Sequence, residues 1–146
     1  MECIRIICHK LIINNNLFDE YLNHVSRSNL GWLATMRSLG KVVRIKESIK
    51  DEELRRKILD NLEFPDAKDL VEKDLHLIEL ALQGDSIIFS FDKRIRRHVS
   101  TIVDLVNEIR KIVWQNPEVD GEDDFCEWLK DVDGTDLELR RLKNTP

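Results

Sequence analysis

Short apolar runs and longer helical patterns alternate along the chain and together predict an α/β fold. Runs rich in β-branched residues at 10–14, 41–45, 86–91 and 111–116 predict strands, and the last two lack polar alternation, which is typical of strands buried on both faces. Apolar spacing of three and four residues predicts helices over 16–27, 30–39, 50–64, 67–83 and 93–110. Because strands alternate with helices, we expect a mainly parallel sheet.

Turn and capping residues predict where these elements end. Asn16 is an expected N-cap, with Asp19 as the acidic half of a capping box. Gly40, Pro65 and Gly84 are expected to end three helices. These signals support the helix boundaries given above.

The two ends of the chain differ from its middle. Residues 1–10 resemble the end of a helix that leads into the first predicted strand. Residues 118–146 begin with an acidic, turn-rich stretch and then show two short helical patterns. We therefore expect one domain over residues 1–117 and a partly helical C-terminal tail over 118–146.

Composition narrows the functional classes. The chain has 146 residues, 42% hydrophobic and 35% charged, which suits one soluble domain with a substantial core. Its net charge of -5 argues against a general binder of nucleic acids or anionic membranes, so any nucleic-acid contact must be local.

Cysteine usage and hydropathy suggest a cytoplasmic protein. Cys3, Cys8 and Cys126 are odd in number and lack CxxC spacing, so we expect neither a disulfide framework nor a zinc site. The N-terminal run lacks a small-residue cleavage site, and no apolar stretch approaches the roughly 20 residues of a membrane span. We expect no signal peptide and no membrane partner.

Asp74 stands out because of its place in the helix 67–83. On a helical wheel it lies among the apolar positions, while His76, Glu79 and Gln83 lie on the opposite, polar side. A buried unpaired charge costs several kcal/mol, so Asp74 either pairs with a buried lysine or arginine or belongs to a functional site. His76 is expected to be a solvated side chain.

Asp92 follows the strand predicted at 86–91, and ligands bind beyond the carboxyl ends of parallel strands. It could cap the following helix, contribute to a site, or do both. One helix and its return strand separate it from Asp74, which allows both carboxylates to reach one edge of the sheet. Such carboxylates repel each other, and a divalent cation such as Mg²⁺ or Mn²⁺ would reverse that interaction.

The stretch "DLHLIELALQGDSIIFSFD" resembles the second half of a PIN domain, in which an aspartate lies on a helix and the next strand ends in S-x-D or T-x-D. "IINNNLFDEYLNHV" and "KIVWQNPE" are similar to two further segments of that family, so the resemblance covers most of residues 4–118. It implies a three-layer fold with a mainly parallel central sheet, and a metal-dependent ribonuclease that uses acidic residues around Mg²⁺ or Mn²⁺.

The resemblance implies that Glu20, Asp74 and Asp92 are catalytic and hold the metal. It alone selects Glu20 over its neighbour Asp19, and a surface glutamate is the ordinary interpretation. The strand that carries the family's first aspartate has no counterpart before Lys10, so we expect an N-terminally incomplete domain with the first strand missing. Two hypotheses follow. The protein is a ribonuclease that is poorly active as this incomplete chain, or it is a module that binds RNA or a protein without cutting.

A basic stretch directly follows Asp92. Lys93, Arg94, Arg96 and Arg97 could contact RNA phosphates at the rim of the site, or form a solvated face that offsets the acidic residues. Trp32, Trp114 and Trp128 could stack on bases but are more often packing residues. RNA is the expected partner. The sequence leaves open a protein inhibitor or complementary partner, and a homodimer.

Overall fold

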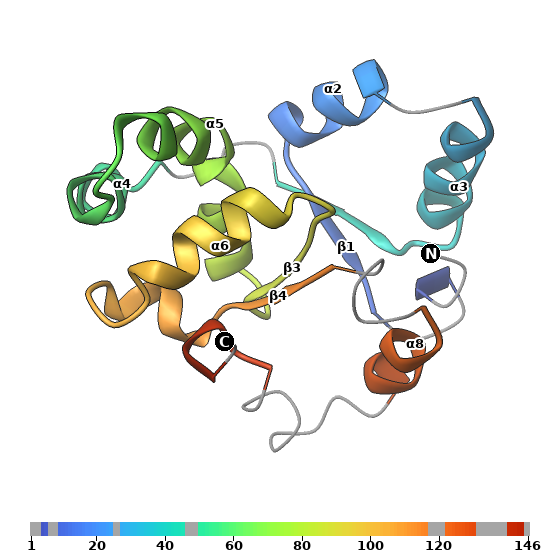
Figure 1. Ribbon diagram of the computed structural model, residues 1–146. Coiled ribbons are helices and arrows are strands. Elements are labelled where there is room, and N and C mark those ends of the chain that lie inside the picture. Colours follow the sequence, from blue (N-terminus) through green and yellow to red (C-terminus); the bar gives the residue numbers. More distant parts are fainter. Residues whose placement is uncertain are drawn as a thin grey trace. The chain divides into compact units, whose positions relative to one another are not determined.

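The computed structural model of the protein describes residues 4–5, 9–24, 27–45, 50–116, 122–130 and 140–144. The chain divides into two compact units, Met1–Ser48 and Ile49–Pro146, and each is described by itself (Figure 1). The structure is mixed α/β, as predicted, and among the described residues short parallel strands form two small sheets. In the same part of the chain, no helix is long and apolar enough to cross a membrane.

The first unit is built on one pair of parallel strands. Its elements are β1 (Leu11–Ile13), α2 (Asn15–His24), α3 (Arg27–Ser38) and β2 (Val42–Arg44). Leu11 lies opposite Val42 in the parallel ladder, so α2 and α3 form the crossover between the two strands. Gly40 has a φ of +69°, a left-handed conformation that favours glycine, and the helix before it ends there as predicted.

The cap of α2 differs from the prediction. The backbone N–H of Leu17 donates to Asn14 Oδ1 at 2.8 Å, so Asn14 and not Asn16 caps the helix. Any of three consecutive asparagines suits this role. The first one takes it because α2 begins at Asn15, directly after β1.

The second unit contains the longer helices and the second sheet. Its elements are α4 (Glu52–Asn61), α5 (Pro65–Leu82), β3 (Ile87–Phe89), α6 (Lys93–Thr101), the 3₁₀ helix η1 (Asn107–Lys111), β4 (Val113–Gln115), α8 (Glu122–Lys130) and the 3₁₀ helix η2 (Leu142–Asn144). β3 and β4 pair in parallel, with Ile87 opposite Val113. α5 packs against α4, α6 and β3, and Figure 1 shows α5 and α6 beside the strands of this unit.

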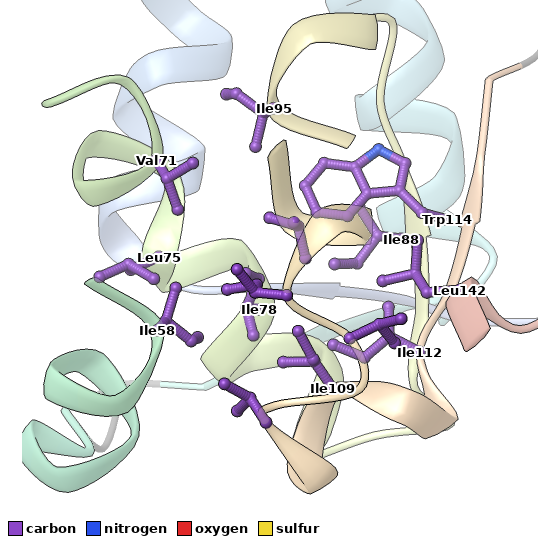
Figure 2. Packing of buried hydrophobic residues seen from close by; sticks show 14 of the residues in the cluster. Ile58, Val71, Leu75, Ile78, Ile88, Ile95, Ile109, Ile112, Trp114 and Leu142 are labelled. Carbon is purple, nitrogen blue, oxygen red and sulfur yellow. The ribbon is translucent and has the colours of Figure 1, made fainter. Parts of the chain in front are cut away.

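One apolar cluster forms the core of the second unit (Figure 2). Its members come from α4, α5, α6, both strands and both 3₁₀ helices. They are Leu54, Ile58, Leu62, Val71, Leu75, Ile78, Ala81, Ile88, Ile95, Val99, Ile102, Val103, Val106, Ile109, Ile112, Trp114 and Leu142. Burial of these side chains is the main term that stabilises this unit.

The segment predicted as a C-terminal tail contributes to that core. Leu142 is buried in the cluster, and its N–H donates to the carbonyl oxygen of Ile112 at 2.8 Å. Arg141 forms an antiparallel bridge with Val113 of β4. The compact units divide after Ser48, and residue 117 lies inside the second of them.

Two predicted elements of the second unit are corrected. The helix expected over 93–110 ends at Thr101, and η1 follows after a turn. Ser100 and Thr101 donate their hydroxyl groups to carbonyl oxygens one turn back, and β-branched residues continue to Val103, which lowers helix propensity there. Pro65, expected to end a helix, instead occupies the first turn of α5, where its missing N–H costs nothing.

The two strands predicted to be buried on both faces differ from each other. All three residues of β4 are buried, as predicted. β3 does not fit that prediction, because Phe89 is 40% exposed and only Ile88 is buried. An apolar strand sequence therefore did not guarantee burial at the carboxyl end of β3.

One cysteine also departs from the sequence prediction. Cys126 in α8 is disulfide-bonded. The spacing of cysteines along a chain does not reveal which of them pair in space. The sequence analysis expected no disulfide framework and did not identify the bond at Cys126.

Candidate functional site

Polar side chains gather at the carboxyl ends of β3 and β4. The N–H of Ser90 donates to the carbonyl oxygen of Gln115 at 3.1 Å, which extends the ladder by one bond. Asn116 is 1% exposed, and its Nδ2 donates to the carbonyl oxygen of Phe91 at 3.1 Å. The loop from Ser90 to Asp92 is therefore fixed to the end of β4. Sequence reasoning missed Asn116 because a single asparagine after a strand is usually a turn residue.

Asp92 caps α6, as one of its two predicted interpretations required. Its Oδ1 accepts the backbone N–H groups of Arg94 at 2.8 Å and Ile95 at 3.2 Å, and its own N–H donates to Ser90 Oγ at 3.1 Å. Oδ2 lies 3.5 Å from Nη2 of Arg94, whose side chain is 75% exposed. One carboxylate oxygen is thus used by the helix, and among the described residues the other has only a long, exposed ion pair.

The surroundings of Asp92 favour its ionised form. Burial raises the pKa of this carboxyl group, but the hydrogen bonds from the Ile95 and Arg94 amides and the positive charge of Arg94 outweigh burial. The net result is a pKa below the ordinary value. Asp92 therefore carries a negative charge at neutral pH, as a metal ligand must.

Asp74 lies in the middle of α5 and is half-buried. The buried side of this helix includes Val71, Leu75 and Ile78, and it extends to Glu79 and His76. The buried side of α5 is therefore centred on other residues than the predicted apolar face, and Asp74 lies at the edge of the buried side. The alternative that a cation pairs with Asp74 stays open.

Asp74 and Asp92 belong to two helices, α5 and α6, that pack into the same core. Figure 2 shows Val71 of α5 and Ile95 of α6 toward the same end of the apolar cluster, away from Ile109 and Ile112. Asp74 follows Val71 by one helical turn, and Asp92 precedes Ile95 by three residues. Asp92 is thus the N-cap residue of α6, whereas Asp74 lies next to Leu75 in the middle of α5.

Two residues assigned to the polar face of α5 are buried. His76 is 6% exposed and its Nδ1 lies 3.0 Å from the carbonyl oxygen of Lys73, so the expectation of a solvated histidine is wrong. Glu79 is 3% exposed and binds Arg55 of α4 through two bonds of 2.6 and 2.7 Å. A partner 24 residues earlier allowed this burial and could not be identified from the pattern of α5 alone.

Glu79 has a structural role in joining α4 to α5. Besides the two bonds to Arg55, its Oε1 accepts the N–H of Asp51, the N-cap residue of α4, at 2.9 Å. Hydrogen bonding to Glu79 raises the pKa of Arg55 above its ordinary value, so Arg55 stays charged. Within the described part of the chain, the Glu79 carboxylate binds α4 and its cap residue, which distinguishes Glu79 from Asp92.

The basic stretch forms one side of α6. Lys93, Arg94 and Arg97 are exposed, and Arg96 is half-buried. The buried positions Ile95 and Val99 lie on the opposite side of the helix. This exposed cationic face fits both predicted interpretations, phosphate contact and solvation.

Glu20 belongs to the first unit, in α2, and is exposed, as is Asp19. Asp74 and Asp92 belong to the other compact unit. Within the described part of either unit, no three His, Cys, Asp or Glu side chains form a group that could hold a metal ion. A ligand set of three therefore stays a prediction.

An open groove of about 550 Å³ lies between α2 and α3 of the first unit. Its lining is mostly apolar and contains none of the predicted site residues: Phe18, Leu22, Leu30, Leu33, Ala34, Arg37 and Ser38. Two of the three tryptophans are packing residues, since Trp114 and Trp128 are buried. Neither feature adds to the candidate site.

No protein-family model, curated protein or solved structure matches the chain.

Proposed function

We propose that the chain is a PIN-like ribonuclease in which Asp74 and Asp92 hold Mg²⁺ or Mn²⁺ and α6 contacts the RNA backbone. The proposal includes a three-layer fold with a mainly parallel central sheet. The observation that carries it is the position of Asp92: a half-buried, ionised carboxylate at the carboxyl end of a parallel strand, followed directly by an exposed basic helix face. RNA is the substrate class that this combination favours.

The carboxylates of Asp74 and Asp92 suit a hard cation. Oxygen ligands are those that Mg²⁺ and Mn²⁺ prefer, and Asp74 and Asp92 would supply them. The long contact between Asp92 Oδ2 and Arg94 is an exposed ion pair, worth less than about 1 kcal/mol, so a cation would displace it at little cost. When bound, the metal would supply an activated water and stabilise developing phosphate charge. Lys93, Arg94 and Arg97 would bind and orient the phosphates.

A second candidate is a PIN-like module that binds RNA without cutting it. The cap of α6 favours this alternative, because it already uses one of the two Asp92 carboxylate oxygens. The exposed cations of α6 would then act alone, and RNA affinity would not depend on a divalent cation.

Cleavage of a single-stranded RNA in Mg²⁺ or Mn²⁺ distinguishes the two candidates. The ribonuclease predicts a slow, metal-dependent cleavage that Asp92→Asn and Asp74→Asn abolish and that Asp85→Asn, before β3, leaves unchanged. Asparagine also caps helices well, so Asp92→Asn should keep α6 intact. RNA binding without cleavage by the wild-type chain would support the second candidate and reject the first.

A further inference from the structure

Phe91 is an exposed aromatic side chain on a fixed loop beside the candidate site. The residue is 59% exposed, although burial of a phenylalanine ring in the core would stabilise the fold. Its carbonyl oxygen accepts a bond from buried Asn116, and the residue after it, Asp92, is held by Ser90 and by the cap of α6. The ring therefore projects from a backbone that is held on both sides.

The charges near Phe91 fit a polyanion. Lys93 and Arg94 follow it within three residues, and Arg97 lies one turn further along the exposed side of α6. Single-stranded nucleic acids bind where cations follow the backbone and aromatic rings stack on the bases. Phe91 and the basic side of α6 present these two kinds of group next to each other.

A second exposed phenylalanine lacks this setting. Phe64 is 63% exposed, but it is flanked by Glu63 and by Asp66 in the first turn of α5. Acidic neighbours would repel a phosphate backbone, so exposure alone does not make a binding residue. Phe64 provides a matched control for Phe91.

We infer that Phe91 stacks on a base of single-stranded RNA while Lys93, Arg94 and Arg97 contact the adjacent phosphates. The inference rests on the proposed function, because it assigns the RNA contact of the same site. It concerns binding and involves no chemical step. Phe91 is thus a binding residue, and Asn116 is a positioning residue that fixes its loop.

The test measures the affinity of a short fluorescent single-stranded RNA in EDTA, where metal-dependent cleavage cannot occur. Phe91→Leu should weaken binding about tenfold, Phe91→Trp should bind at least as tightly as wild type, and Phe64→Leu should match wild type. With an oligomer of the same length that lacks bases, Phe91→Leu should bind like wild type. Melting curves would verify that each variant is folded.

Three results would overturn the inference: wild-type affinity of Phe91→Leu for the RNA, an equal loss on the oligomer without bases, or no RNA binding by the wild-type chain. Its failure is distinguishable from failure of the proposed function. Metal-dependent cleavage with unchanged affinity of Phe91→Leu rejects the stacking alone. Binding that depends on Phe91, without cleavage in Mg²⁺ or Mn²⁺, rejects the ribonuclease and keeps the stacking.

Discussion

Glu79 and Asp92 lie in the same unit, and each accepts backbone N–H groups and faces an arginine, yet their surroundings differ. Glu79 has a side chain that is 2% exposed and binds Arg55 through two short bonds. Asp92 has a side chain that is 29% exposed and lies 3.5 Å from a mostly exposed arginine. A carboxylate whose negative charge is fully paired within the protein stabilises the fold. A carboxylate whose charge is only partly paired can still bind a cation from solution.

The largest expected effect concerns Glu79. Glu79→Gln would leave the Arg55 charge without its carboxylate in a mostly buried position, and we expect a loss of about 3 kcal/mol in the free energy of unfolding. Urea unfolding would measure this loss. Glu53→Gln, at an exposed partner of Lys57, is the control and should cost clearly less, because exposed ion pairs contribute little to stability. If Glu79→Gln and Glu53→Gln lost equal stability, burial would not make the Glu79 pair special, and the contrast between Glu79 and Asp92 would fail.

A smaller effect is expected for the cap at Asp92. Asp92→Ala removes the acceptor of two N–H groups at the start of α6 and should cost about 1 kcal/mol. Asp92→Asn should cost clearly less, because the amide oxygen can accept the same bonds. Thermal melting of the two variants would compare them. If alanine and asparagine were equally costly, the cap would not be the main structural role of Asp92.

Acid should affect wild type and Asp92→Asn differently. Because the pKa of Asp92 is lower in the folded state than its ordinary value, its charge contributes stability above a pH of about 4. That contribution is lost as the pH falls through the lowered pKa, and Asp92→Asn never has it. Urea unfolding at a series of acidic pH values should show the two curves converging as the pH falls. Curves that stay parallel would contradict the lowered pKa.

The smallest effect concerns a single cation on α6. Arg97→Ala should reduce the slope of log affinity for single-stranded RNA against log salt concentration by about 0.7, the value expected for one lost phosphate contact. Arg56→Ala, an exposed arginine of α4, is the control and should leave the slope unchanged. Fluorescence anisotropy at several salt concentrations would give both slopes. An unchanged slope for Arg97→Ala would indicate a solvated face.

Signals from neighbouring residues predicted the helices, strands and caps better than they predicted the tertiary contacts of these elements. The alternation of strands and helices, the burial of β4, the end of α3 before Gly40 and the cap at Asp92 were all readable from neighbouring residues. These features depend on backbone conformation and short-range hydrogen bonds. Sequence patterns report such properties directly.

Features that depend on distant residues were missed. The burial of Glu79 requires Arg55, the fixed loop at Phe91 requires Asn116, and the core position of Leu142 requires the end of η1. A helical wheel contains none of these partners, so it placed Glu79 on the solvent side. The site prediction met the same limit, because Asp74 and Asp92 belong to the second unit and Glu20 belongs to the first.

The most direct test of the account is a titration of the chain with Mn²⁺, followed by electron paramagnetic resonance of the unbound ion. We predict one binding site, and Asp92→Asn and Asp74→Asn should each weaken Mn²⁺ binding by at least about tenfold. Loss of a residue that only hydrogen-bonds to a metal ligand already weakens metal binding by about that factor, and loss of a ligand itself should cost no less. Asp85→Asn should bind like wild type. Unchanged Mn²⁺ affinity in both Asp92→Asn and Asp74→Asn would contradict a metal site at these two aspartates.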